Sequence, residues 1–198
     1  MPTEIWFRPL IWMDYRLAVL FTVVIPLILL IWAFVQKSEA IQRLLTIYWR
    51  VSSLLAITVY LLIASFQVGF ISGLMARILI PISLWFWVDL NEEIDDQPSS
   101  PLKLTFNSWR WAITLYSILG AIAQLPNLQC GFSSQAINQS VCQAWLEPAL
   151  IFKDYFHPNT QPGFLGFLGA AGLVFYVLCL SYFVFFKLGK QGRTAVRQ

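Results

Sequence analysis

The 198-residue chain is poor in charge, since Asp, Glu, Lys and Arg make up 12% of it. A soluble domain carries about 25% charged residues, so this shortage excludes an ordinary water-soluble globule. A disordered chain is also excluded, because disorder requires low hydrophobicity and 58% of these residues are hydrophobic. A net charge of +3 does not provide the basic surface of a nucleic-acid-binding protein, so we expect no nucleic acid as a partner.

Residue patterns that support catalysis or metal binding are equally scarce. His157 is the only histidine, which leaves a bis-histidine haem, a multi-histidine zinc site and a Ser–His pair without support. The sequence has neither a CxxC pair nor a phosphate-binding glycine loop. We therefore expect no catalytic residue, no metal and no cofactor. A pigment or quinone held between aromatic-rich helices remains an open hypothesis.

Long apolar runs are what the chain has in abundance, and its mean hydropathy is +0.67. A helix crosses a bilayer core of about 30 Å with about 20 apolar residues. The runs predict an all-α, polytopic membrane bundle of about five transmembrane helices, with residues 1–198 as one membrane domain. The predicted spans are 17–35, 44–66, 71–90, 109–125 and 164–186. The second and third runs are so close that a tight or re-entrant hairpin is an alternative to two full crossings.

The distribution of lysine and arginine predicts the orientation, because basic residues beside spans tend to stay in the cytoplasm. One side of the predicted spans collects Lys37, Arg43, Arg50, Lys103, Arg110, Lys187, Lys190, Arg193 and Arg197. The other side has Arg8, Arg16 and Lys153. We therefore expect the N-terminus outside or in a lumen, the C-terminus in the cytoplasm, and the long loop 126–163 outside.

Two cysteines, Cys130 and Cys142, fall in this outside loop. Disulfides form and persist in oxidising compartments, so we predict a bridge between them, and two free thiols at the membrane surface are the alternative. Cys179 lies inside the last run and is expected to be a small buried hydrophobic side chain.

Four carboxylates, Asp89, Glu92, Glu93 and Asp96, have i, i+3, i+4, i+7 spacing and share one face if the third helix continues past the membrane. The helix dipole disfavours anions at a C-terminus, so we expect a cation to meet them. The partner is internal (Arg43, Arg50, Lys187, Lys190 or Arg193), a basic segment of another protein, or a divalent cation. We therefore predict a partner-binding face here.

Arg77 lies inside the third run, where an arginine costs about 2.5–3.5 kcal/mol at the centre of a span. Because no acidic residue or histidine lies in the middle of any run, we expect no intramembrane carboxylate to pair with it. We expect its guanidinium to reach the outer interface instead. The same absence removes the proton relay of a coupled transporter.

A stripe of small residues, Gly163, Gly166, Gly169 and Gly172, opens the last run. Small residues at helical spacing let another helix approach closely, and such packing holds helices together in lipid. The partner of the stripe is another helix of this chain or a different subunit.

Several strings in the chain are distinctive, among them Asp14-Tyr15-Arg16-Leu17, Ile47-Tyr48-Trp49-Arg50-Val51, Trp85-Phe86-Trp87-Val88-Asp89, Trp109-Arg110-Trp111 and Phe164-Leu165-Gly166-Phe167. With them the chain resembles, over nearly its whole length, a cyanobacterial family of integral membrane proteins catalogued as a domain of unknown function. The resemblance implies a cyanobacterial thylakoid or plasma membrane. It supplies no catalytic residues.

Two functional hypotheses follow. The first is a non-enzymatic accessory, assembly or scaffold component of membrane complexes, photosynthetic ones in particular, which binds other membrane proteins within the lipid bilayer. The second is a small transporter, channel or lipid-handling protein. Its polar path would consist of Arg77 with Ser52, Ser53, Thr58, Ser65 and Gln67.

Overall fold

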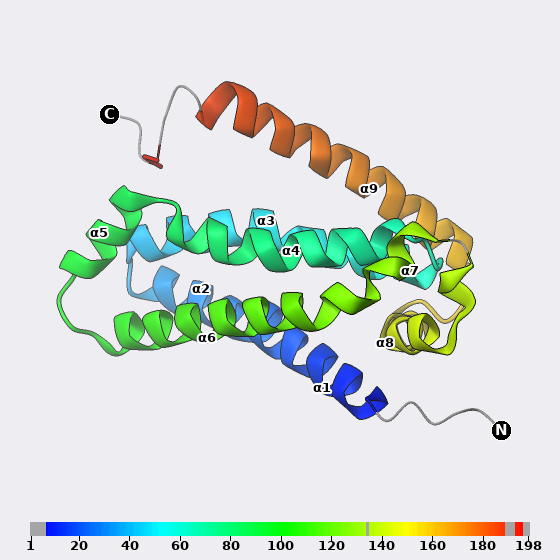
Figure 1. Ribbon diagram of the computed structural model, residues 1–198. Helices are drawn as coiled ribbons and strands as arrows, with labels where there is room; N and C mark the ends of the chain where they lie inside the picture. The colour runs from blue at the N-terminus through cyan, green and yellow to red at the C-terminus, as the bar shows by residue number, and fades with distance from the viewer. Residues whose placement is uncertain (1–6, 134, 189–192, 196–198) are drawn as a thin grey trace.

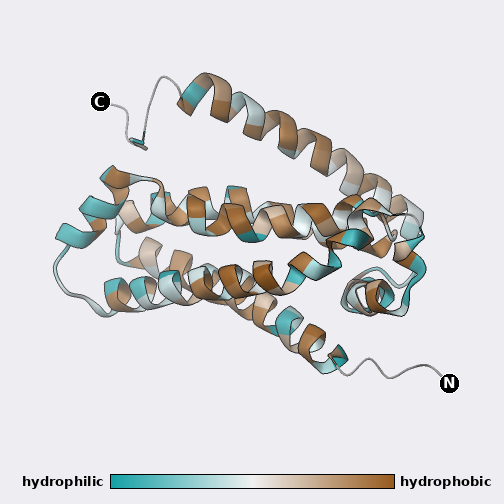
Figure 2. Cartoon of the chain, viewed as in Figure 1, coloured by the Kyte–Doolittle hydropathy of each residue, from teal (hydrophilic) through white to brown (hydrophobic). Residues whose placement is uncertain are grey.

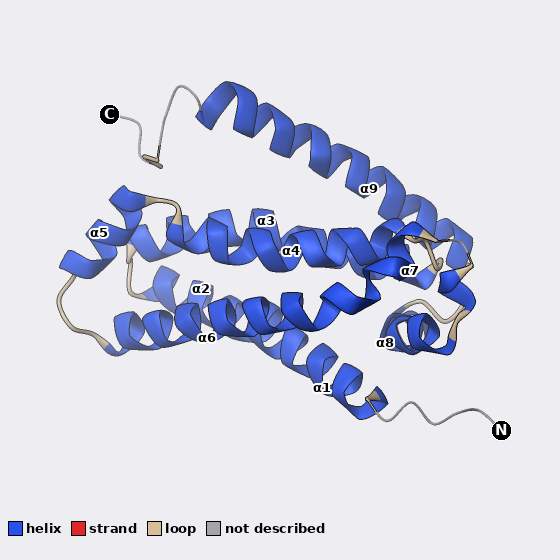
Figure 3. Cartoon of the chain, viewed as in Figure 1, coloured by secondary structure: helices blue, strands red, loops and turns tan. Residues whose placement is uncertain are grey.

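The computed structural model describes residues 7–133, 135–188 and 193–195, and in these ranges the chain forms helices, turns and loops with no strand (Figure 3). Its α-helices are α1 (Arg8–Val19), α2 (Ile25–Val35), α3 (Glu39–Ile63), α4 (Val68–Trp85), α5 (Val88–Asp96), α6 (Pro101–Gln124), α7 (Gln129–Phe132), α8 (Ser140–Phe156) and α9 (Pro162–Tyr182). Two π-helical segments, η1 (Leu20–Val24) and η4 (Phe183–Leu188), and two 3₁₀ turns, η2 (Leu125–Leu128) and η3 (Ala136–Asn138), complete the set. The all-α prediction is therefore confirmed for the described residues.

Four stretches are long and apolar enough to cross a membrane: Arg8–Val35, Glu39–Ile63, Val68–Trp85 and Pro162–Leu188. The α3 and α4 helices are both in this set, as two full crossings require. The predicted count of about five spans is not confirmed, because α6, which contains all of the run 109–125 except its last residue, is not among the four.

The α6 helix nevertheless buries polar residues and exposes apolar ones. Its buried polar residues are Arg110, Thr114, Ser117 and Gln124. Its exposed side carries the large apolar residues Leu104, Trp111, Leu115, Leu119 and Ile122. Figure 2 shows apolar residues, in brown, along the long helices of the bundle. A helix in water has the opposite arrangement, so α6 has the surface of a helix that meets lipid.

The helices begin and end at different residues from the predicted runs. The first helix begins at Arg8, well before residue 17, and therefore includes Asp14. The third predicted run does not form one helix, because α4 ends at Trp85 and Trp87 has extended backbone before α5 starts. The predicted outside loop 126–163 contains α8 and the short α7, which pack at one end of the bundle (Figure 1).

The π-helical segment η1 accepts hydrogen bonds from two neighbouring helices. The N–H of Ile25 bonds the carbonyl of Leu20 rather than that of Phe21, and Pro26 has no N–H to donate to Thr22. Two carbonyls are thereby freed inside the bundle. The Tyr48 hydroxyl donates to the Thr22 oxygen at 2.7 Å and the Trp109 indole N–H donates to the Phe21 oxygen at 2.8 Å. Both freed acceptors are thus satisfied by side chains of α3 and α6, as a water-free environment requires.

The last long helix, α9, contacts α3 near its own start and then diverges from the bundle (Figure 1). Most of its large side chains are exposed, including Phe167, Phe175, Leu178 and Phe185. Residues 193–195 return to the junction of α4 and α5, where the Val88 N–H donates to the Arg193 carbonyl at 3.2 Å.

Candidate functional site

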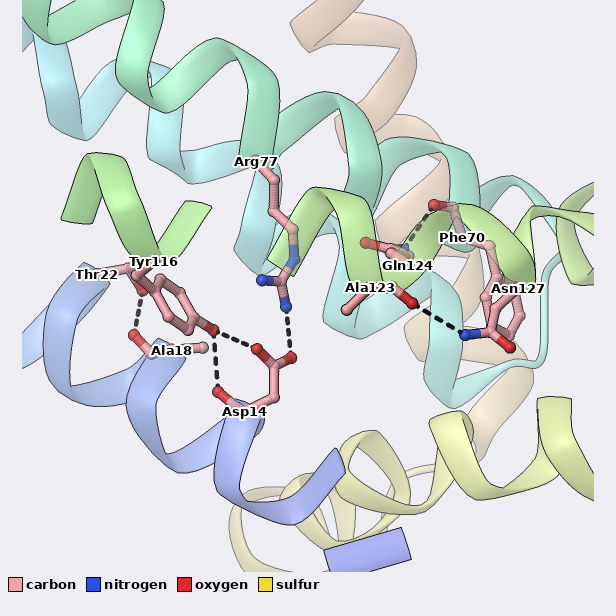
Figure 4. A network of polar contacts seen from close by, with 9 residues as sticks. All are labelled: Asp14, Ala18, Thr22, Phe70, Arg77, Tyr116, Ala123, Gln124 and Asn127. Atoms are coloured by element: carbon pink, nitrogen blue, oxygen red, sulfur yellow. Dashed lines mark hydrogen bonds and ion pairs between the residues drawn. The ribbon is translucent and has the colours of Figure 1, made fainter. Parts of the chain in front are cut away.

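The Arg77 site joins three helices of the bundle. Arg77 of α4 forms an ion pair with Asp14 of α1, and Tyr116 of α6 donates its hydroxyl to the same carboxylate at 2.8 Å (Figure 4). The guanidinium carbon also lies 5.3 Å from the centre of the Tyr116 ring. The Arg77 side chain is only 12% exposed and that of Asp14 23%. The expectation that no carboxylate pairs with Arg77 is therefore wrong.

The error has a definite source. Asp14 precedes the charge-free run that predicted the first span, but helix α1 begins at Arg8 and places Asp14 beside the middle of α4. Burying an ion pair costs less free energy than burying one unpaired charge, because the attraction between the two charges offsets part of their desolvation. The presence of an acidic residue within two turns of a predicted span was the available indication.

Gly120 of α6 makes room for the guanidinium of Arg77. A Cβ atom at this position would lie 1.6 Å from Nη1 and 2.6 Å from Cζ of Arg77. The Arg77 side chain therefore passes directly over the Gly120 backbone and reaches Asp14. The sequence analysis missed Gly120 and Tyr116, since neither residue type indicates an ion-pair site by itself.

A second set of polar contacts lies farther along the same helices. The buried Gln124 side chain donates to the Phe70 carbonyl at 3.0 Å (Figure 4). Thr58 and Ser72 share a hydrogen bond of 2.9 Å between α3 and α4. These contacts satisfy polar groups that lie between packed helices.

Three residues of the predicted polar path use their hydroxyls in hydrogen bonds to their own helix. Ser52, Ser53 and Thr58 each donate to a carbonyl of their own helix. Ser65 and Gln67 lie in the turn between α3 and α4, where Ser65 has a positive φ of 56°. Three of these hydroxyls therefore bond within α3, and Thr58 also bonds Ser72 of α4.

Arg110, one of the basic residues on the predicted cytoplasmic side, is buried among aromatic rings near α5. Its guanidinium carbon lies 4.1 Å from the centre of a Trp85 ring and 5.7 Å from that of Phe106. It also donates to the Asn91 side-chain oxygen at 2.5 Å. Cation–π contact with flanking rings explains how a buried arginine is accommodated here.

The acidic residues lie on α5, which is a separate helix, so its dipole does not oppose Asp89 in the first turn. Leu90 and Ile94 fix one face of α5 to the bundle, whereas Glu92, Glu93, Asp95 and Asp96 are exposed. Asp95 was not in the predicted set.

Only some of the acidic residues of α5 have a partner within the described part of the chain. Asp89 accepts a hydrogen bond of 2.8 Å from the Ala195 N–H. In residues 7–133, 135–188 and 193–195, none of the salt bridges involves Glu92, Glu93 or Asp96. Of the internal cations considered, Lys190 lies outside the described residues. The outward face of α5 is therefore negatively charged and accessible.

The glycine stripe packs against α3 of the same chain, which is the internal alternative. A Cβ on Gly166 would lie 2.2 Å from the Cβ of Ala64, and one on Gly169 would lie 3.0 Å from the Leu61 nitrogen. Gly172 is near Ile57 at 3.4 Å, whereas nothing lies within 4 Å of Gly163. The stripe thus holds α9 and is largely covered, with Gly163 left open.

The Cys130–Cys142 disulfide is present, with 5.8 Å between the two Cα atoms. It packs with Phe70, Ala136 and Leu146 and ties α7 to α8 at the end of the bundle opposite α5 (Figure 1). Nearby, the ring nitrogen Nε2 of His157 shares a hydrogen bond of 2.9 Å with the Tyr60 hydroxyl. Cys179 is exposed on α9 rather than buried.

The charged and polar groups of the Arg77 site are bonded to one another. Within the described part of the chain, no group of three or more His, Cys, Asp or Glu side chains is placed to hold a metal ion. Arg77 and Asp14 neutralise one another, and Tyr116 is bonded to the same carboxylate. The site joins α1, α4 and α6.

Comparison with known proteins places the chain in a family to which no function has been assigned. A family model described as "Protein of unknown function (DUF3177)" matches residues 8–196. No curated protein and no solved structure matches the chain.

Proposed function

The chain belongs to this DUF3177 family, and we propose that it is a non-enzymatic accessory, assembly or scaffold component of membrane protein complexes. The observation that carries the proposal is the outward face of α5. Glu92, Glu93 and Asp96 are exposed on a helix whose other face is fixed by the fully buried Leu90 and Ile94. A rigid anionic surface of this kind selects a basic segment of a partner by charge complementarity.

The Arg77 geometry weighs against the alternative of a transporter, channel or lipid-handling protein. A polar path needs an arginine that faces water, whereas Arg77 is 12% exposed and paired with Asp14. The hydroxyls assigned to the path bond their own helices.

We propose a cyanobacterial thylakoid or plasma membrane as the location and photosynthetic complexes as clients. We further propose α6 as a fifth crossing, because its exposed side is apolar and its polar residues face inward. An odd number of crossings puts the termini on opposite sides. The disulfide end of the bundle then lies outside or in the lumen, where such bonds persist. The α5 end, with Lys37, Lys103 and Arg193, lies in the cytoplasm.

The test is co-purification of a tagged chain from its native membrane in mild detergent, with mass spectrometry and an absorbance scan of the eluate. The variant is the triple change Glu92→Lys, Glu93→Lys and Asp96→Lys, which leaves Asp89 with Ala195. We expect partners recovered with the wild type to be lost. Asp154→Lys reverses an exposed charge on α8 and serves as the control that should retain them.

Formation of the Cys130–Cys142 disulfide in each variant reports that the chain has inserted and folded. If the triple variant forms the disulfide and still retains every partner, α5 is not the docking surface. A colourless eluate that contains the wild-type chain alone would remove the scaffold proposal. A pigment in that eluate would favour the pigment hypothesis instead.

A further inference from the structure

Arg50 is a charged residue on the outside of a membrane helix. It lies eleven positions after Glu39 in α3, which ends at Ile63, and its side chain is exposed. An arginine at the centre of a span costs about 2.5–3.5 kcal/mol unless it meets water or an anion. In the described residues, Arg77 and Arg43 form salt bridges to carboxylates, whereas Arg50 forms none. Water or an anion that is not a carboxylate of the described residues therefore has to accompany it.

Arg50 borders a cleft on the surface of the bundle, with a volume of about 480 Å³. Its lining consists of Phe34 of α2, Ala195, and the α3 residues Glu39, Gln42, Arg43, Thr46, Ile47 and Arg50. Arg43 and Arg50 are seven residues apart, so they share one face of α3 at a separation of about 10 Å along its axis. Side chains of a helix tilt toward its N-terminus, which directs Arg50 toward Arg43 and the membrane surface near Glu39.

The cleft combines positive charge with an apolar wall. Glu39 neutralises Arg43 at 2.8 Å, so the two arginines and one glutamate leave one net positive charge. Phe34 is 59% exposed, and together with Ile47 it forms an apolar surface beside the charge. A soluble anion would use only the arginines, whereas a lipid would use both parts of the cleft.

We propose that this cleft binds a lipid with an anionic phosphate or sulfonate headgroup, in the leaflet that surrounds the α5 end of the bundle. Arg50 and Arg43 donate hydrogen bonds to the headgroup oxygens, and an acyl chain lies along Ile47 and Phe34. The site is separate from the acidic face of α5 and does not depend on the scaffold proposal.

The experiment is native mass spectrometry of the full chain, purified in a neutral detergent and titrated with phosphatidylglycerol, phosphatidylcholine or inorganic phosphate. We expect the wild type to retain one phosphatidylglycerol and to prefer it to phosphatidylcholine. Arg50→Gln should lower this affinity about tenfold, the equivalent of one lost charge-assisted hydrogen bond. Arg16→Gln, which removes an exposed arginine of α1, should leave it unchanged.

A second variant keeps the proposal testable if Arg50→Gln does not fold. Thr46→Phe fills the cleft at an exposed position and keeps both arginines, so it should also abolish lipid retention. Equal retention of phosphatidylglycerol by the wild type and Thr46→Phe would overturn the proposal. Competition by millimolar inorganic phosphate as strong as that by the lipid would overturn the lipid assignment and leave a soluble anion as the ligand.

Discussion

The bundle of α1 to α4 and α6 is held together differently from α9. Polar side chains cross between helices inside the bundle, as in the Arg77–Asp14 ion pair and the bonds from Tyr48 and Trp109 to the carbonyls of η1. The α9 helix instead brings the backbone of Gly166 and Gly169 against α3. Apolar burial does not distinguish a neighbouring helix from lipid, so these are the two means of association available.

The α9 helix diverges from the bundle beyond its glycine contacts, the last of which is that of Gly172 with Ile57. Beyond them, the Tyr176 hydroxyl reaches the Val51 carbonyl at 3.3 Å, and Phe183 meets the Trp87 ring at 5.9 Å between centroids. We infer that the stability of the bundle depends on polar groups, whereas that of α9 depends on the absence of side-chain atoms.

The largest effect is expected from breaking the ion pair. Asp14→Ala leaves Arg77 buried without its partner and should lower the free energy of unfolding by about 3–5 kcal/mol. Unfolding in mixed micelles by increasing fractions of a denaturing detergent measures it. The double variant Asp14→Ala with Arg77→Leu should recover most of the loss, because no charge remains unpaired. Equal stability of the wild type and the single variant would contradict the structural role of the pair.

Gly120→Ala tests the same region without removing a charge. The added methyl group occupies the position of Arg77 Nη1, so the guanidinium must move away from Asp14. We expect a loss of about 1–3 kcal/mol, typical of overpacking. In the Arg77→Leu background the space is vacated and the same substitution should have little effect. A loss of the same size in both backgrounds would show that Gly120 acts independently of Arg77.

Gly166→Ala and Gly163→Ala form a matched pair for α9. The first adds a methyl group 2.2 Å from the Cβ of Ala64, and the second adds one with nothing within 4 Å. We expect Gly166→Ala to detach or shift α9 at a cost of about 1–3 kcal/mol, while Gly163→Ala is neutral or slightly stabilising. Protease accessibility of the segment between α8 and α9, followed by gel electrophoresis, reports the detachment. Identical digestion patterns would mean that close packing does not hold α9.

The helical class and most helices of this fold were predictable from apolar runs, because length and hydrophobicity directly determine what can cross a bilayer. The partners of the polar residues were not predictable from these runs. A run without charges ends where a charge appears, so Asp14 was assigned to the flank although its helix continues past it. Arg110 lies in the first turn of the predicted run 109–125, and its burial between Trp85 and Phe106 was not predicted either. The break at Trp87 separates α5 from α4, and no proline or glycine marks it in the sequence.

Tyr48→Phe examines the smallest of these polar connections. The hydroxyl of the fully buried Tyr48 is the donor to the Thr22 carbonyl, which Pro26 cannot satisfy. Removing it leaves a buried acceptor unpaired, and we expect a loss of about 1 kcal/mol, at the lower end of the range because a carbonyl tolerates partial satisfaction. In the Pro26→Ala background a backbone N–H becomes available to Thr22, so the same substitution should have a smaller effect. If both backgrounds lose the same amount, the tyrosine contributes through the packing of its ring against Trp109 rather than through its hydrogen bond.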